Sequence, residues 1–222
     1  GPNGAGKTTT FNACTGLLRP TEGRVRLFGE DVTSLPPQAR ARRGLGRTFQ
    51  RMELFDSLTV LENIAMGREA AMAGAAPLSH LAARRAHRRL LEEVTREALD
   101  RCGIADLALR RTADLSTGQR RLVELARAVA GGFRMLLLDE PSSGLDKSET
   151  KRFGEILGEL VADGQRGILI VEHDMALVMG ICSYLYVLDF GQLLFQGTPA
   201  EVGASPIVRA AYLGSEEVSE SA

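Results

Sequence analysis

This sequence of 222 residues lacks an excess of charge of either sign, and it lacks long apolar runs. Its formal net charge is −1, whereas a general nucleic-acid-binding protein usually carries a basic excess. Apolar runs such as 135–138 and 168–171 have the length of strands, while a membrane-spanning helix needs roughly 20 apolar residues. We therefore expect one globular unit with no nucleic-acid partner, which would reach a membrane only by binding another protein.

Cysteine is also scarce, and its positions form no framework. Cys14, Cys102 and Cys182 have neither the spacing of zinc ligands nor that of a disulfide-linked domain. We interpret them as small buried apolar residues in a reducing compartment. The chain is long enough to bury a sizeable core, and it has no repeats and no low-complexity linker.

The sequence pattern changes twice along the chain. Up to about residue 50 it predicts a helix at 9–18 and strands at 23–28 and 45–49. The strand signal is then absent to about residue 130, and apolar residues recur at helical steps. Strands are predicted again at 135–139, 167–172, 184–189 and 192–195. We therefore predict one α/β domain over 1–222, with a core of 1–50 and 131–222, a mainly parallel sheet and a helical subdomain inserted at 51–130.

The first residues form a glycine-rich motif that fits G-x-x-x-x-G-K-[ST]. The motif reads Gly1-Pro2-Asn3-Gly4-Ala5-Gly6-Lys7-Thr8, followed by Thr9 in the predicted helix. Glycines allow backbone N–H groups to surround phosphate oxygens, and the helix directs its positive end at the same anion. Lys7 would reach the β- and γ-phosphates of a nucleotide, and the Thr8 hydroxyl would bind Mg²⁺. The alternative is a chance glycine turn.

A second motif, Met135–Pro141, places two acids at the end of an apolar strand. Asp139 suits the water-mediated coordination of Mg²⁺, and Glu140 suits the polarisation of an attacking water. An exposed acidic strand end is the alternative, and the phosphate-binding motif weakens it.

A third motif, Leu115-Ser116-Thr117-Gly118-Gln119, precedes an amphipathic helix. Ser116 and Gln119 would form a capping box, which by itself needs no function. Together with the other motifs, however, it resembles the signature of the ATP-binding-cassette family. There Ser116, Thr117, Gly118 and Gln119 would clamp the γ-phosphate of ATP held by the opposite subunit. The family usually has glycine where this chain has Thr117, a difference that leaves the contacts of the helix end and of Ser116 intact.

Three further matches follow the order of that family. Gln50 resembles the glutamine that contacts Mg²⁺ and senses the transporter, although alone it is an ordinary residue at a strand end. Residues 143–146 resemble the loop called the D-loop, although by themselves they are a turn that caps a helix. His173 resembles the switch histidine near the γ-phosphate, although a lone histidine is usually structural. The resemblance thus implies Glu140, His173 and Gln50 as catalytic residues, with ATP as nucleotide and Thr8, Gln50 and Asp139 as contacts to Mg²⁺.

Within the family, the chain is similar to the ATPases of branched-chain amino-acid importers. The similarity lies in 46–51, in 172–179 and in the ending Ala211-Tyr212-Leu213-Gly214. It implies a head-to-tail dimer with an identical or a different cassette, at the cytoplasmic face of the membrane. Transmembrane permease subunits would bind it, and a periplasmic or extracellular solute-binding protein would act indirectly. Importers of urea and other amides share this pattern.

Exposed apolar residues after Gln50 suggest where a permease would bind. Met52, Leu54 and Phe55 would meet a helix of the membrane subunit, or they would pack in the core of the helical insertion.

Other classes of protein share the motifs. A DNA-repair or chromosome ATPase would need a long coiled coil between Gln50 and Leu115, and that gap holds only modest helices. A soluble translation factor with two cassettes would need a second cassette, and only a short acidic tail follows Leu213. A catalytically dead binding module is disfavoured because Lys7, the acidic pair and His173 are all present.

The start of the chain is unusual. The first residue is Gly1 rather than methionine, and the glycine motif begins with it, without a signal peptide before it. A phosphate loop needs a preceding strand, and cassettes of this family place an adenine-stacking aromatic residue upstream. We therefore expect an α/β P-loop ATPase (ABC ATPase) core whose N-terminal strands are missing, and weak ATP binding by the fragment.

Overall fold

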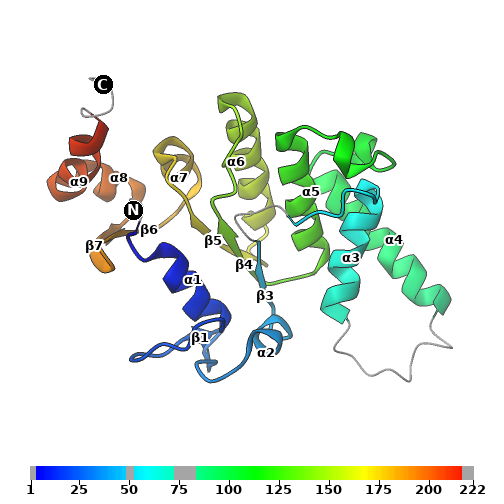
Figure 1. Cartoon of the computed structure of the whole chain (residues 1–222), viewed down its shortest axis with the longest axis horizontal. Helices are drawn as coiled ribbons and strands as arrows, with labels where there is room; N and C mark the ends of the chain where they lie inside the picture. Colours follow the sequence, from blue (N-terminus) through cyan, green and yellow to red (C-terminus); the bar gives the residue numbers. More distant parts are fainter. Residues whose placement is uncertain (1–3, 49–52, 73–83, 217–222) are drawn as a thin grey trace.

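The structure is a computed structural model that describes residues 4–48, 53–72 and 84–216 (Figure 1). The helices in that part of the chain are α1 (Lys7–Thr15), α2 (Pro37–Ala41), α3 (Val60–Met72), α4 (Arg84–Arg101), α5 (Thr117–Ala130), α6 (Lys147–Val161), α7 (Met175–Ile181), α8 (Pro199–Ala204) and α9 (Pro206–Glu216). The strands are β1 (Arg26–Leu27), β2 (Glu30–Asp31), β3 (Leu45–Arg47), β4 (Met135–Asp139), β5 (Gly167–Val171), β6 (Leu185–Asp189) and β7 (Gln192–Gly197). None of the helices described is long and apolar enough to cross a membrane.

A three-stranded parallel sheet lies at the centre, in the order β3-β4-β5. Its middle strand, β4, buries Leu136, Leu137 and Leu138, since helices cover both faces of a parallel sheet. The register pairs Asp139 with Val171, so the carboxyl ends of β4 and β5 meet at one edge. The predictions of an apolar strand at 135–139 and of a parallel sheet are confirmed.

The other strands form two antiparallel pairs, β1-β2 and β6-β7. The predicted strand at 23–28 is wrong in length, since β1 holds only Arg26–Leu27. Phe28 and Gly29 take φ values of 50° and 86°, which turn the chain back into β2. β3 likewise ends at Arg47, two residues before the predicted end.

The predicted helix at 9–18 is α1, which begins two residues earlier and ends three residues earlier than predicted. Gly16, with φ of 84°, ends it. The buried guanidinium of Arg40 then donates to the carbonyl oxygens of Ala13 and Cys14, both at 2.7 Å. These bonds satisfy acceptors that the end of a helix leaves unpaired, so α2 anchors α1.

The helices α3, α4 and α5 lie at one end of the molecule, and β6, β7, α8 and α9 lie at the other (Figure 1). One apolar cluster joins Ile64 of α3 and Leu125 of α5 to Leu138 of β4 and Ile156 of α6. The helical end and the sheet therefore share a core. The division into a core and a subdomain at 51–130 stays a prediction.

Candidate nucleotide site

The start of α1 has the geometry of a phosphate-binding loop. Gly4 and Gly6 take φ values of 80° and 89°, which side chains with a Cβ rarely adopt. Gly6 is the N-cap of α1, and no side chain among the described residues caps it. The N–H groups of a helix start and a lysine side chain both favour an anion, so the first turn of α1 with Lys7 suits a phosphate. Gly1, Pro2 and Asn3 lie outside the described residues, and Thr8 and Thr9 are exposed on the first turn.

The turn between β6 and β7 supports this loop from the other end of the chain. The Gly191 N–H donates to the carbonyl oxygen of Ala5 at 3.2 Å. A Cβ at Gly6 would lie 3.3 Å from the Cα of Gly191, so glycine allows the close approach. The β6-β7 hairpin, which lies near the other end of the sequence, thus holds the loop in place.

The predicted acidic pair and the predicted histidine lie at neighbouring ends of β4 and β5. The Asp139 side chain is buried, whereas that of His173 is 63% exposed. Glu140 has φ of 47°, a conformation that costs a non-glycine residue about 1–3 kcal/mol and persists only where its surroundings impose it. Its N–H donates to the Val171 carbonyl at 2.8 Å. Strand pairing therefore brings these predicted residues together.

A buried arginine connects Asp139 to the phosphate-binding helix. Arg47 Nη2 lies 3.0 Å from Asp139 Oδ2, and both side chains are less than 10% exposed (8% and 7%). Its Nη1 donates to Asn12 Oδ1 at 2.7 Å, and its guanidinium lies 5.5 Å from the ring centre of Phe11. Arg47 therefore joins β3, β4 and α1.

A cavity of about 840 Å³ lies between β5 and β6. Its walls are mainly apolar residues of α1, β5, α6, α7 and β6. Of the predicted site residues that the structure describes, only Lys7 lines it. The phosphate-binding turn thus lies at the margin of this cavity rather than inside it.

The signature motif forms the start of α5. Ser116 Oγ accepts from the Gln119 N–H at 3.2 Å, and Gln119 Oε1 accepts from the Ser116 N–H at 3.1 Å. The predicted capping box is therefore confirmed. Gly118 is buried against Glu149 of α6. A Cβ at this position would lie only 2.2 Å from the Glu149 carboxylate, so glycine allows the close approach.

Thr117, which stands where the family usually has glycine, lies beside residues 143–146. A Cβ at Gly144 would lie 3.1 Å from Thr117 Cγ2. Asp146 caps α6 through a second capping box with Glu149. The signature and the predicted D-loop therefore pack against each other within this chain, and Thr117 remains exposed.

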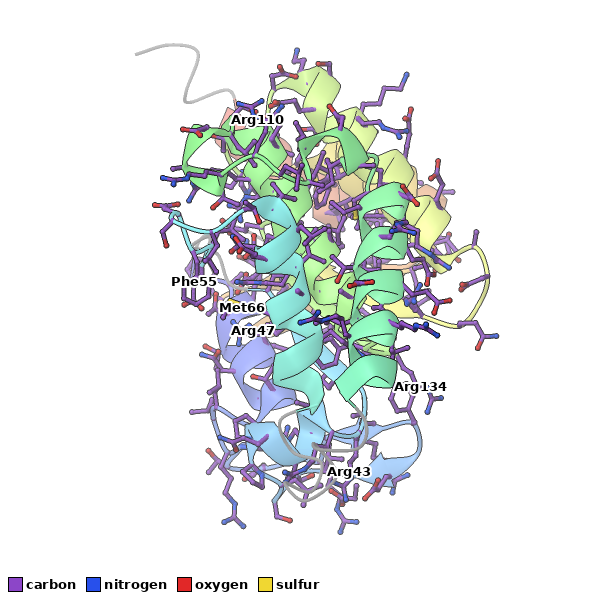
Figure 2. All side chains as sticks on the ribbon, turned by 90° about the vertical axis from the view of Figure 1, so that its right-hand side faces the viewer. Arg43, Arg47, Phe55, Met66, Arg110 and Arg134 are labelled. Carbon is purple, nitrogen blue, oxygen red and sulfur yellow. The ribbon has the colours of Figure 1, made fainter. Side chains whose placement is uncertain are left out.

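The apolar residues after Gln50 were predicted either to meet a permease or to pack in the core, and the structure shows a different outcome for each of the two it describes. Gln50 and Met52 lie outside the described residues. Leu54 packs against the main core, whereas Phe55 is 48% exposed at the edge of the molecule (Figure 2). The core interpretation thus describes Leu54, and the surface interpretation describes Phe55.

These residues fit a magnesium nucleotide. In the parts of the chain that are described, no group of three or more histidine, cysteine, aspartate or glutamate side chains could hold a metal. Mg²⁺ bound with a nucleotide takes most of its ligands from phosphates and water, and needs only one or two protein oxygens. The Thr8 hydroxyl would supply one such oxygen directly, and Asp139 would act through water.

A phosphate-binding helix start beside an acidic strand end, on an α/β sheet with inserted helices, is typical of P-loop nucleotide hydrolases. The chain belongs to the ABC transporter family, whose sequence model matches residues 1–143. The model of the branched-chain amino acid ATP-binding cassette transporters matches residues 192–218. As a member of the family, the chain is a nucleotide-binding ATPase subunit of a transporter complex.

Individual relatives agree with this family. The chain is 41% identical over 217 residues to LivG of Salmonella typhimurium, a high-affinity branched-chain amino acid transport ATP-binding protein. The alignment covers 96% of this chain and 85% of LivG. It is 38% identical over 217 residues to LptB of Acidithiobacillus ferridurans, a lipopolysaccharide export system ATP-binding protein, with 97% and 84% covered. The ADP conformation of MJ1267, an ATP-binding cassette of an ABC transporter, has a TM-score of 0.81 at 32% identity, over 96% of this chain and 85% of that one.

Sequence reasoning missed Arg47 and Glu172. Arg47 holds Asp139, and the Glu172 side chain is fully buried beside His173. Glu172 directly follows the apolar run 168–171, and Arg47 is the last residue of β3. Since a buried charge needs a partner, that pattern is a signal for a buried ion pair or hydrogen-bonded carboxylate.

Proposed function

We propose that this chain energises an importer of branched-chain or other hydrophobic amino acids. The observation that carries the proposal is the match of residues 192–218 to the branched-chain amino acid cassettes, together with the similarity to LivG. The solute itself does not contact this subunit, so the proposal concerns the transporter to which the chain belongs.

Within the site, we assign each residue a role. Lys7 and the N–H groups of Gly4–Thr9 bind the phosphates, since cations and N–H groups at a helix start stabilise them. Mg²⁺, when bound, neutralises charge on the phosphates, and Thr8, Asp139 and Gln50 would hold it directly or through water. Glu140 polarises the attacking water, and His173 lies near the γ-phosphate.

The signature requires a second cassette. Ser116, Thr117, Gly118 and Gln119 lie at the start of α5, on a different element from the phosphate-binding turn of α1. We propose that they complete the site of an opposite subunit, in a head-to-tail dimer. ATP binding and dimerisation are then thermodynamically linked, because neither half-site is complete alone.

We propose that the segment 53–59 binds a permease subunit at the cytoplasmic face of the membrane. The Phe55 backbone is held rigidly, since its N–H donates to Asn63 Oδ1 at 2.9 Å and its carbonyl accepts from Thr112 Oγ1 at 2.8 Å. Asn63 and Thr112 are both fully buried. A rigid backbone with an exposed aromatic side chain suits an interface anchor.

The same segment is connected to the signature helix. Arg120 of α5 forms an ion pair with Asp56 at 2.7 Å, and Arg127 donates to the Glu53 carbonyl. A movement of α5 during ATP-driven closure would therefore pull on the segment that carries Phe55. This supports a path from nucleotide to permease.

The test of the proposed substrate is reconstitution. The neighbouring genes should encode two membrane subunits and a solute-binding protein, and the complex in vesicles should take up labelled leucine when ATP is present. Urea uptake without leucine uptake would favour the amide importers. A complex that instead extracts lipopolysaccharide, as the similarity to LptB allows, would overturn the proposal.

A further inference from the structure

Glu172 has an environment that the roles above do not use. It lies between the last residue of β5 and His173, and its side chain is 0% exposed. Oε1 accepts from the Ser142 N–H at 2.8 Å. Oε2 accepts from the N–H groups of His173 at 3.1 Å and Asp174 at 3.4 Å. A buried carboxylate is costly without such donors, so this one is retained by backbone groups of two loops.

The two loops are those that carry the predicted catalytic residues. Ser142 is two residues beyond Glu140, and His173 follows Glu172 directly. The left-handed backbone of Glu140 is held on one side by the Val171 carbonyl, which accepts from its N–H. On the other side, the Glu172 carboxylate holds the chain at Ser142. A strained residue needs such constraints to keep its conformation.

We propose that Glu172 is a positioning residue for ATP hydrolysis. Its carboxylate fixes the loop of His173 against the loop of Glu140, so that both side chains approach the γ-phosphate in one arrangement. The proposal rests on the proposed function, since it uses the roles of Glu140 and His173. Glu172 itself does not touch the nucleotide, and ATP binding at α1 does not depend on it.

The discriminating variant is Glu172→Gln. The amide has one acceptor oxygen, so it can serve Ser142 or the pair His173 and Asp174, while its NH₂ group faces the remaining donors. We expect kcat to fall at least tenfold, with the Kd for ATP changed less than twofold. A matched control is Glu201→Gln, because Glu201 Oε2 accepts from the Thr198 N–H at 2.7 Å, on α8. That variant should keep the kcat of the parent.

A double-mutant cycle separates positioning from general destabilisation. If Glu172 acts in part through Glu140, Glu172→Gln should cost a clearly smaller factor in kcat in the Glu140→Gln background than in the parent. Losses that multiply in the double variant would overturn the proposal. So would a Glu172→Gln protein with parental kcat, while Glu140→Gln is inactive. If Glu140→Gln itself turns over at the parental rate, the proposed function fails instead.

A second variant covers the case in which Glu172→Gln does not fold. Glu172→Asp keeps the charge but is one methylene shorter, so it can reach His173 and Asp174 but not Ser142. We expect it to melt cooperatively near the parent and to lose kcat with unchanged ATP affinity. Parental kcat in this variant would contradict the bridge between the loops.

Discussion

Three carboxylates lie at one edge of the parallel sheet, and each has a different environment. Asp139 pairs with Arg47, Glu172 accepts backbone N–H groups, and Glu140 follows the strand in a left-handed conformation. Chemically identical groups thus serve different purposes, because their surroundings determine which of them can meet water and phosphate.

Glu140→Gln should separate binding from hydrolysis. The amide cannot accept a proton from water, so we expect turnover to fall on the order of 10²–10⁴-fold while ATP is still bound. Size-exclusion chromatography with ATP and Mg²⁺ should then find a long-lived dimer. Lys7→Ala is the contrast, because it removes a cation from the phosphates and should weaken ATP binding roughly tenfold to a hundredfold. Equal ATP affinity in the two variants would contradict these assignments.

Arg47→Met should destabilise the protein through Asp139. Removing one partner of a buried ion pair leaves the other charge uncompensated, which costs about 3–5 kcal/mol. Urea unfolding measures this loss. The double variant with Asp139→Asn should recover most of it, because the remaining side chain is neutral. If the double variant is as unstable as Arg47→Met, the pair at 3.0 Å does not carry the effect.

The elements around the site connect it to the surface. The capped start of α5 carries the signature, and its arginines Arg120 and Arg127 hold the segment 53–59. Because α5 is one continuous helix of 14 residues, we expect a displacement at its capped end to reach the segment. We therefore expect the exposed side chain of that segment to affect transport rather than hydrolysis.

Phe55→Ser should uncouple transport from hydrolysis. Truncating an aromatic interface anchor typically costs about 2 kcal/mol or more of binding free energy. In vesicles, uptake should fall while the ATPase rate and the melting temperature of the isolated subunit stay near the parent. Phe28→Ser is the matched control, because Phe28 is also 48% exposed but lies in the β1-β2 turn. Unchanged uptake in Phe55→Ser, or an equal loss in the control, would refute the docking surface.

The molecule as a whole is held by a core that joins the helical end to the sheet. Cys102 lies in this core with 0% exposure, and burial raises the pKa of its thiol to about 12. Cys14 and Cys182 are only partly buried. The reactivity of the Cys102 thiol should therefore follow unfolding of the core, whereas Cys14 and Cys182 can react in the folded protein.

Labelling of Cys102 should follow global unfolding. The thiolate is the reactive form, and at pH 8 a thiol of pKa about 12 is ionised in roughly one molecule in ten thousand. In native protein, mass spectrometry should therefore find Cys102 unmodified when Cys14 or Cys182 has reacted. Denaturant should make all three react. Rapid labelling of Cys102 in native protein would contradict a core shared by α4, α5 and the sheet.

The sequence by itself determined the local features. The glycine turn before α1, the capping box of Ser116 and Gln119, and the apolar strand at 135–139 each depend on neighbouring residues, whose spacing is visible in the chain. Strand ends were predicted less well, since the turn at Phe28 depends on backbone conformation rather than on apolar pattern.

The tertiary structure alone decided which distant groups meet. Arg47 and Asp139 are 92 positions apart, and Glu172 and Ser142 are 30 apart. No spacing in the sequence encodes these contacts, because they arise when β3, β4 and β5 pair in one register. Packing likewise decided that Leu54 enters the core while Phe55 faces solvent, since both residues are apolar and the sequence alone does not distinguish them.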